Sequence, residues 1–320
     1  MSEDNVLSID NTQNGKEKEK LHDDIQPIID AIKILEDPKK SVWKNLLYFL
    51  LSVVLFISLG LFYNPIVDLA ILVGVILFHE LGHYIAMTSF GYKDVKMFFI
   101  PLFGAAVSGK PENISGAKRA IVTLAGPIPG ILLGFFLGFF AGASENYLAM
   151  QISIMLLFIN GFNLLPIYPF DGGRFLFDVI LSRQKYVEAM FKLLAVAILV
   201  GIAIYLQDLF FGFIAFIVSA TIRSGFLIGS IANEFSERNE LLSYNKLLEL
   251  PREYLDTLIS KIKEAFPILI GKKAYANYTI QLWDKLNNTP PSLGQSIGLL
   301  LIYFVALLIV IWPFILIGVV

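Results

Sequence analysis

Long apolar runs separated by short polar stretches dominate the pattern of hydrophobic and polar positions along the chain. A transmembrane helix needs roughly 20 consecutive apolar residues. Runs of about this length lie near residues 43–63, 66–90, 117–142, 147–165, 188–206, 208–231 and 296–320. The pattern therefore predicts an all-α polytopic membrane protein with six or seven transmembrane helices.

The first 40 residues are polar and mixed in charge, which is typical of a largely disordered tail. Within this tail, five apolar residues recur at helical spacing: Ile25, Ile28, Ile29, Ile32 and Leu35. This spacing predicts a short amphipathic helix, for which we favour a position on the bilayer surface. Residues 41–232 would then form the membrane core.

A second polar segment covers residues 233–292 and precedes a last apolar run over 293–320. Its apolar residues also have helical spacing, as in Leu255, Leu258, Ile259, Ile262 and Phe266. We expect one or two cytoplasmic amphipathic helices here. A packing lid on the membrane core is favoured over a partner-binding module. Residues 293–320 are expected to form a C-terminal transmembrane helix.

Composition agrees with a membrane location and excludes several kinds of chemistry. The chain has 320 residues, of which 56% are hydrophobic and only 16% are charged, and its mean hydropathy is +0.68. A net charge of −2 and the lack of any nucleic-acid-binding motif give no reason to expect nucleic acid as a partner. Since the chain has no cysteine, disulfides, thiolate ligands and cysteine nucleophiles are all excluded.

The distribution of lysine and arginine predicts the orientation in the membrane. Basic residues precede the first apolar run and follow the second, whereas "FYNPIVD", between the first and second runs, and "GASENY", between the third and fourth, contain none. By the positive-inside rule, the N-terminus is cytoplasmic and the second run crosses from outside to inside. At about 1.5 Å per residue, Glu80 would lie roughly 15 Å from the inner end of that helix. The site described next is thus expected within the bilayer, nearer its cytoplasmic face.

The second apolar run contains the sequence "HELGH", residues 79–83. On a helix, His79 and His83 share one face, so both imidazoles can bind one metal ion while Glu80 reaches the adjacent position. This is the arrangement of a zinc hydrolase, in which the glutamate takes a proton from the attacking water. Interhelical hydrogen bonding by the histidines is the alternative. Ionisable groups inside a membrane span favour the functional interpretation.

A third metal ligand is expected at Asp171. Asp68 lies in the same apolar run as His79 but roughly 16 Å away along the helix axis, which is too far to share a metal ion. In "NGFNLLPIYPFDGGRF", by contrast, two prolines and a Gly-Gly pair interrupt an apolar run, and Asp171 lies at this interruption. Non-helical backbone at membrane depth occurs where it is buried in protein or lines a watery cavity. Asp178 could support the site but could not replace Asp171.

Together, "HELGH" and "NLLPIYPFDGG" resemble the two signature motifs of the site-2 protease family of intramembrane zinc metalloproteases. The resemblance covers roughly residues 66–232. It implies that His79, His83 and Asp171 hold one zinc ion per chain and that Glu80 is the catalytic base. It also implies that Asn163 contacts the substrate or steadies the transition state.

The stretch "VKMFFIPLFGAAVSGK" is similar to the membrane-associated β-hairpin of this family, which would offer a strand edge to an unwound substrate. The resemblance further implies that the substrate is a single-span membrane protein, cut within its transmembrane segment. Two other interpretations remain open: a noncatalytic zinc-binding scaffold or transporter, and a membrane zinc hydrolase acting on a lipid or a small amide. The intact Glu80 argues against the scaffold, because metal binding alone does not require it.

The third apolar run repeats glycine every four residues, at Gly126, Gly130, Gly134 and Gly138. Small residues on one face allow helices to approach closely. We therefore favour a packing role for this glycine face over a substrate groove.

Overall fold

The computed structural model describes most of the chain. The described residues are 24–36, 42–61, 65–100, 104–111, 114–181, 187–235, 244, 246–267 and 271–316. The expectation of disorder for residues 1–23 therefore lies outside them. The chain divides into two compact units: unit 1 comprises Met1–Lys39 and Phe226–Asn287, and unit 2 comprises Lys40–Gly225 and Asn288–Val320.

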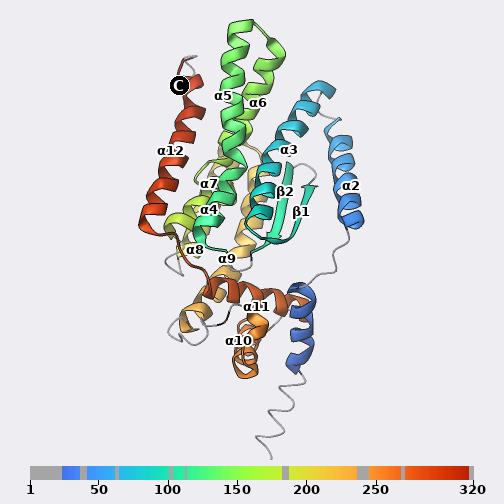
Figure 1. Ribbon diagram of the computed structural model, residues 1–320, viewed down its shortest axis with the longest axis vertical. Coiled ribbons are helices and arrows are strands. Elements are labelled where there is room, and N and C mark those ends of the chain that lie inside the picture. The colour runs from blue at the N-terminus through green and yellow to red at the C-terminus, as the bar shows by residue number, and fades with distance from the viewer. Residues whose placement is uncertain are drawn as a thin grey trace, which may run out of the picture. The chain divides into compact units, whose positions relative to one another are not determined.

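Six apolar helices among the described residues are long enough to cross a membrane. These segments are Trp43–Gly60, Ile66–Ser89, Gly116–Ser144, Val187–Leu206, Leu209–Phe235 and Leu293–Pro313. They correspond to α2 (Val42–Gly60), α3 (Ile66–Ser89), α4 and α5 (Gly116–Ala125 and Pro127–Ser144), α8 (Val187–Leu206), α9 (Leu209–Phe235) and α12 (Leu293–Leu316) (Figure 1). A shorter apolar helix, α6 (Tyr147–Asn163), lies beside α5. The predicted all-α polytopic fold is confirmed.

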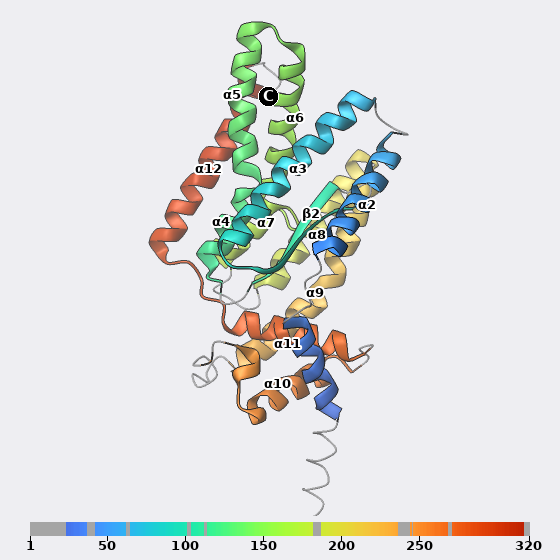
Figure 2. The same ribbon diagram turned by 45° about the vertical axis from the view of Figure 1, so that its right-hand side comes forward.

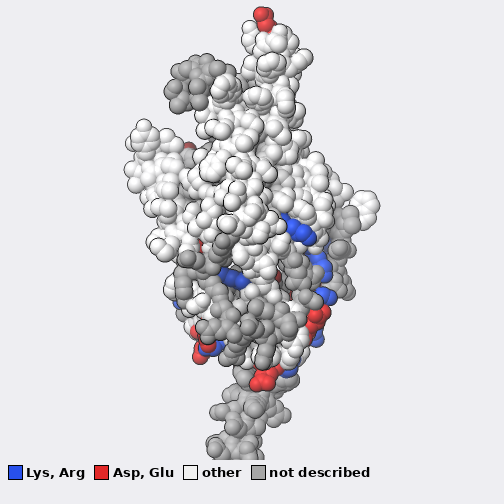
Figure 3. All heavy atoms as spheres, turned by 60° about the vertical axis from the view of Figure 1, so that its left-hand side comes forward, with Lys and Arg blue, Asp and Glu red and all other residues white. Residues whose placement is uncertain are grey.

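The surface of unit 2 is suited to lipid. Many large apolar side chains are exposed there, among them Phe136, Phe139, Tyr205 and Phe216. On the face drawn in Figure 3, the surface over the long apolar helices is almost free of charged side chains. In water such a surface would aggregate, whereas a bilayer covers it.

A two-stranded antiparallel sheet follows α3, as the sequence predicted. Strand β1 (Lys93–Ile100) pairs with β2 (Gly104–Lys110), and Phe98 lies opposite Ala106. Strand β2 runs along α3: a Cβ at Gly104 would contact Ile76, and one at Gly109 would contact Met87. The two strands are visible beside α3 in Figure 2.

Helix α2 packs on the other strand of this hairpin. The Phe56 and Phe99 rings lie 5.1 Å apart, and the backbone N–H of Phe99 donates to Ser52 Oγ at 2.9 Å. This bond satisfies one backbone group of β1 that is not used in pairing with β2. Within the described residues, β2 pairs with no strand other than β1.

Three of the four glycines, Gly130, Gly134 and Gly138, lie where α5 packs on α6, which confirms the predicted packing role for them; Gly126 precedes α5, and a Cβ there would lie 2.2 Å from Nε2 of His83. Added Cβ atoms would lie 2.3 Å from the amide of Asn160 at Gly130, 3.0 Å from Leu156 at Gly134, and 2.5 Å from Ser153 at Gly138. A larger side chain at any of these contacts would force its neighbour on α6 to shift, so the glycines favour the close approach of the two helices.

After α6 the chain leaves the helix over residues 164–170 and then forms α7 (Asp171–Leu176) and a π-helical turn, Phe177–Leu181. Helix α12 anchors this interruption. The Tyr303 hydroxyl donates to the carbonyl oxygen of Leu164 at 2.6 Å, and its ring stacks on Phe175 with centroids 4.9 Å apart. The predicted break in the helical backbone is therefore present and firmly held.

Unit 1 has its own apolar core. A helix over residues 24–36 packs with the end of α9, a 3₁₀ turn at Leu247–Glu249, α10 (Arg252–Ala265) and α11 (Lys272–Leu286). Arg252 Nη1 donates to Gln26 Oε1 at 2.9 Å, which ties the first of these helices to α10. The helical character predicted for residues 233–292 is confirmed where the structure describes them.

The preferred position of the 24–36 helix on the bilayer surface was wrong. Ile25 and Ile32 are 0% exposed, and Ile28 and Ile29 are 3% exposed, in a core shared with Leu258 and other residues of unit 1. Burial of an isoleucine side chain in protein stabilises by roughly 1.5–3 kcal/mol. The apolar face is thus used for folding of unit 1.

Candidate metal centre

Helix α3 carries the "HELGH" motif into the interior of unit 2. His79, Glu80 and His83 are buried, with 4%, 8% and 7% of their surfaces exposed. The packing of α3 against α4 explains why the motif contains a glycine at position 82. A Cβ at Gly82 would lie 1.9 Å from the carbonyl oxygen of Ala125, so only glycine allows α3 to approach the end of α4.

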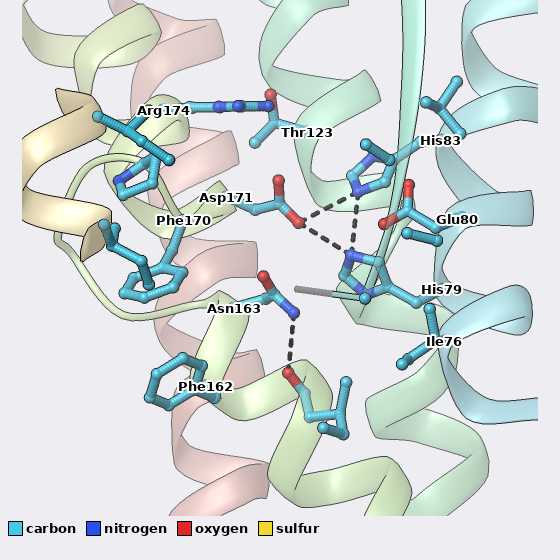
Figure 4. Close-up of a pocket in the computed structure, with 18 of the residues that line it drawn as sticks. Ile76, His79, Glu80, His83, Thr123, Phe162, Asn163, Phe170, Asp171 and Arg174 are labelled. Carbon is cyan, nitrogen blue, oxygen red and sulfur yellow. Dashed lines mark hydrogen bonds and ion pairs between the residues drawn. The ribbon is translucent and has the colours of Figure 1, made fainter. Parts of the chain in front are cut away.

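Three potential ligand atoms converge in this interior. Nε2 of His79 and Nε2 of His83 lie 3.1 Å apart, and each lies 3.1 Å from Oδ2 of Asp171 (Figure 4). The ligand set expected from the sequence, two histidines on one helix and an aspartate 88 residues after His83, is thus brought together.

The opposite nitrogens of both imidazoles face hydrogen-bond acceptors. Nδ1 of His79 lies 2.8 Å from Oδ1 of Asn160, and Nδ1 of His83 lies 2.8 Å from the carbonyl oxygen of Val122. The amide of Asn160 is oriented because its Nδ2 donates to the carbonyl oxygen of Leu156. Each neutral imidazole therefore carries its hydrogen on Nδ1, which leaves a lone pair on Nε2.

This donor set fits a zinc ion. Two imidazole lone pairs and a carboxylate oxygen facing one another repel unless a cation or a proton lies between them. With zinc–nitrogen distances of about 2.0–2.1 Å, the ligand atoms of a tetrahedral site lie about 3.3 Å apart. The observed separations of 3.1 Å are within a few tenths of an ångström of that value. Among the described residues, these three side chains form the group that could hold a metal ion.

Two glycines place Asp171 at the metal centre. A Cβ at Gly172 would lie 2.1 Å from the carbonyl oxygen of Leu164, and one at Gly173 would lie 2.4 Å from the carbonyl carbon of Ile167. The start of α7 can therefore fold directly against the preceding loop. Tyr168 of this loop also contacts α8: the Lys192 ammonium lies 5.1 Å from the centroid of the Tyr168 ring and 2.9 Å from Glu188 Oε1.

A cavity of about 590 Å³ adjoins the converging ligand atoms. It is lined by side chains of α3, α6 and α9, by the loop before Asp171, and by β2 over Gly104, Ala105, Ala106 and Val107. In Figure 4, the Glu80 carboxylate lies beside the two imidazoles. Within the described part of the chain, no side chain or backbone group donates a hydrogen bond to this carboxylate, so it is available to a water molecule or a substrate.

Asn163 lies in a different local structure from the one expected. The sequence suggested that it belongs to the interrupted segment, but it is the last residue of α6. Its side chain lines the cavity, and its Nδ2 donates to the carbonyl oxygen of Ile159 at 3.0 Å. In Figure 4, Asn163 and Arg174 lie on opposite sides of Asp171.

The two other carboxylates considered from the sequence lie outside the ligand group. Asp68 accepts a hydrogen bond from Gln151 at 2.5 Å, near the beginning of α3. Asp178 lies in the π-helical turn after α7. The exclusion of Asp68 as a ligand agrees with the three-residue group found in the structure.

Sequence reasoning missed Asn160 and the backbone of α4. Asn160 is 0% exposed and contacts His79 directly. An amide in an otherwise apolar run, three residues before Asn163, was a detectable signal, because polar groups inside a span need partners. The carbonyl of Val122 gives no sequence signal, since any residue has one.

The fold and the centre define a polytopic membrane protein with a buried site of two histidines and one aspartate. Residues 68–147 of this chain match the sequence profile of Peptidase family M50. The matched stretch includes the "HELGH" motif and ends before Asp171. The resemblance to the site-2 protease family, first indicated by the two motifs, is confirmed by this match and by the curated relatives.

Two curated proteins are similar to this chain. A zinc metalloprotease of Methanocaldococcus jannaschii is 29% identical over 176 residues, which cover 52% of this chain and 50% of the relative. Stage IV sporulation protein FB of Bacillus subtilis is 30% identical over 132 residues, which cover 40% of this chain and 44% of the relative. The chain spans about half the length of the curated relatives it matches.

Among solved structures, the site-2 protease from Methanocaldococcus jannaschii is similar at 24% sequence identity and a TM-score of 0.40. The similarity covers 55% of this chain and 86% of that one.

Proposed function

We propose that this chain is an intramembrane zinc endopeptidase that hydrolyses peptide bonds in the transmembrane segments of membrane proteins. The observation that carries the proposal is the meeting of Nε2 of His79, Nε2 of His83 and Oδ2 of Asp171 beside Glu80, on a cavity within a bundle of membrane-spanning length. Such a bundle gives access to substrates that are themselves in the bilayer.

His79, His83 and Asp171 would hold one zinc ion per chain. When bound, zinc lowers the pKa of a water molecule toward 7 and polarises a carbonyl oxygen. Glu80 takes the proton of the attacking water on its carboxylate and later gives a proton to the leaving amine. Because it lies one residue after His79 on the same helix, Glu80 keeps a fixed position relative to the ligands.

Strand β2 would present the substrate. A peptide bond in a helix is shielded, and the substrate must become extended before it can be cut. The cavity is bordered by Gly104–Val107 of a strand that, within the described residues, pairs only with β1. An extended segment can add to such an edge through backbone hydrogen bonds. The small side chains of Gly104, Ala105 and Ala106 leave room for it.

Asn163 would contact the substrate backbone from the opposite side of the cavity. Its Nδ2 is used by Ile159, but its Oδ1 is an additional hydrogen-bond acceptor on the cavity wall. The expected partner is a backbone N–H of a substrate that has left its helix. A single-span membrane protein fits this description, because such a helix can enter the bundle from the side.

The N-terminus is proposed to be cytoplasmic, with the site nearer the cytoplasmic face. The support is the placement of Lys39 and Lys40 before the first span, of Lys44 at its beginning, and of further lysines between the second and third spans.

The test compares wild type with Glu80→Gln, which keeps the side-chain shape and removes the base. Quantitative proteomics and lipidomics of membranes from cells carrying either form identify what accumulates. The accumulating single-span protein is then reconstituted with each form in liposomes. We expect turnover to fall by about 10²–10⁴-fold, with the zinc content unchanged.

Three results would overturn the proposal. Wild-type cleavage by Glu80→Gln, in a preparation free of other proteases, would refute the role of the base. A change confined to lipid species in the cellular comparison would instead identify a lipid hydrolase, and no change of either kind would favour the zinc-binding scaffold.

A further inference from the structure

Asn160 is enclosed between the metal centre and its own helix. It is 0% exposed, its Oδ1 lies 2.8 Å from Nδ1 of His79, and its Nδ2 donates to the carbonyl oxygen of Leu156 at 2.7 Å. The bond to Leu156 determines which end of the amide faces His79. If the amide were flipped, its oxygen would face the carbonyl oxygen of Leu156, and two acceptors would lie against one another.

We propose that Asn160 is a positioning residue, which holds the hydrogen of His79 on Nδ1 and directs Nε2 toward the metal. The inference rests on the proposed function, because it concerns the same centre. A neutral imidazole has one N–H, and only the other nitrogen can bind a metal ion. An acceptor fixed at Nδ1 therefore favours the ligating tautomer before the metal arrives and limits rotation of the ring.

The two histidines obtain this orientation from different sources. His83 faces the carbonyl oxygen of Val122, which belongs to the backbone of α4. His79 depends on a side chain, and its acceptor can be removed by substitution. Asn160 thus offers a way to test orientation separately from ligation.

Gly130 on α5 reserves the space that Asn160 occupies. A Cβ at Gly130 would lie 2.3 Å from Nδ2 and 2.6 Å from Oδ1 of Asn160. Because the amide is bonded on both sides and fully enclosed, it cannot move away without losing a hydrogen bond. Gly130 therefore acts on the metal centre through Asn160, in addition to allowing α5 and α6 to pack.

The same helix pair contains a matched control at a distance from the centre. Ser153 on α6 is 2% exposed and donates to the carbonyl oxygen of Gly134 at 2.7 Å. A Cβ at Gly138 would lie 2.5 Å from Ser153 Oγ. Ser153 and Gly138 thus repeat the contact of Asn160 and Gly130, but without touching a metal ligand.

The experiment measures zinc affinity of the purified full-length chain by competition with a chelator, and thermal unfolding of the zinc-free form. Asn160→Ala should lower zinc affinity by about 10–100-fold, as losses of outer hydrogen bonds to metal-binding histidines do. Ser153→Ala should leave zinc affinity at the wild-type value, although it also removes a buried hydrogen bond. Asn160→Asp keeps an acceptor for Nδ1 of His79 and should recover part of the lost affinity.

The glycine variants provide an independent readout. Gly130→Ala should weaken zinc binding, and the double variant Gly130→Ala, Asn160→Ala should be no weaker than Asn160→Ala alone, because both changes remove the same contact. Gly138→Ala should destabilise the zinc-free protein but keep its zinc affinity.

Wild-type zinc affinity in Asn160→Ala would overturn the proposal, and so would an equal loss in Ser153→Ala, which would indicate a general packing effect. These measurements need no substrate, so their outcome is independent of the proteolysis test. Normal turnover by Glu80→Gln would refute the proposed function while leaving the role of Asn160 intact. A wild-type chain that binds no zinc would refute both.

Discussion

Gly82 offers a sharp test of how helix packing controls the metal centre. Replacing it with alanine adds a Cβ whose position is 1.9 Å from the carbonyl oxygen of Ala125. A carbon and an oxygen in ordinary contact lie about 3.3 Å apart. Helices α3 and α4 would therefore have to separate by about 1.4 Å, since the obstructing atom belongs to the backbone and cannot rotate away.

This separation would break the hydrogen bond that orients His83. Nδ1 of His83 lies 2.8 Å from the carbonyl oxygen of Val122 on α4. Adding about 1.4 Å gives about 4.2 Å, which is too long for a hydrogen bond. We expect Gly82→Ala to cost about 1–3 kcal/mol in stability through overpacking. Loss of the histidine orientation should lower zinc affinity by about 10–100-fold.

Gly74 provides the control within the same helix. A Cβ at Gly74 would meet nothing within 4 Å, so Gly74→Ala should be neutral or stabilising by up to about 1 kcal/mol. Both variants are compared in detergent by thermal unfolding with and without chelator, and by zinc competition. If Gly82→Ala matches wild type in stability and zinc affinity, or if Gly74→Ala is equally impaired, the packing argument is wrong.

Three further predictions concern the metal, the substrate and unit 1. The purified chain should contain about one zinc ion, lost on chelation and in the double variant His79→Ala, His83→Ala; equal zinc content in both proteins would contradict the ligand assignment. Asn163→Ala should slow cleavage without changing the zinc content, and helix-breaking Gly or Pro residues near the scissile bond of the substrate should partly restore the rate. An equal defect on substrates with and without these residues would make Asn163 a structural residue. Ile32→Asp, at a 0% exposed position, should destabilise unit 1 by about 3 kcal/mol or more and speed proteolysis of residues 24–36. Ile34→Asp, at a 66% exposed position, should change neither stability nor proteolysis. Equal digestion of the two variants would refute the assigned core.

The membrane helices and the ligand set were accessible from the sequence because each has a strong local signal. A span is an uninterrupted apolar run, and His79 and His83 stand out within one. Asp171 was identified because Pro and Gly interrupt a run that otherwise favours a helix. These signals depend on neighbours within a few residues, and such patterns are what a single sequence records.

The remaining features depend on contacts between distant segments. The isoleucines of the 24–36 helix have the same spacing whether they face lipid or protein, and only the presence of α10 and α11 decides between the two. The role of Val122 at His83 is carried by a backbone carbonyl, which leaves no residue-type signature. Asn160 was visible as a polar residue in an apolar run, but its partner, 81 residues away, was not.

Unit 1 is built from two segments that lie far apart in the chain, and this limits how many times the chain can cross the bilayer between them. Its helix at residues 24–36 precedes the first span, α10 follows α9, and Gln26 and Arg252 are joined by a hydrogen bond. Both segments must therefore lie on one side of the membrane, so an even number of crossings separates them. Five of the long apolar segments lie between them, from Trp43–Gly60 to Leu209–Phe235, and five is odd.

We propose that the shorter apolar helix α6 supplies the missing crossing. Its 17 residues extend about 26 Å, somewhat less than the roughly 30 Å of a hydrocarbon core. Completing the passage thus requires the loop over residues 164–170 and the start of α7 as well. We therefore propose, from the parity of the topology, that the interruption that carries Asp171 lies partway through a crossing, where a soluble protease could not reach.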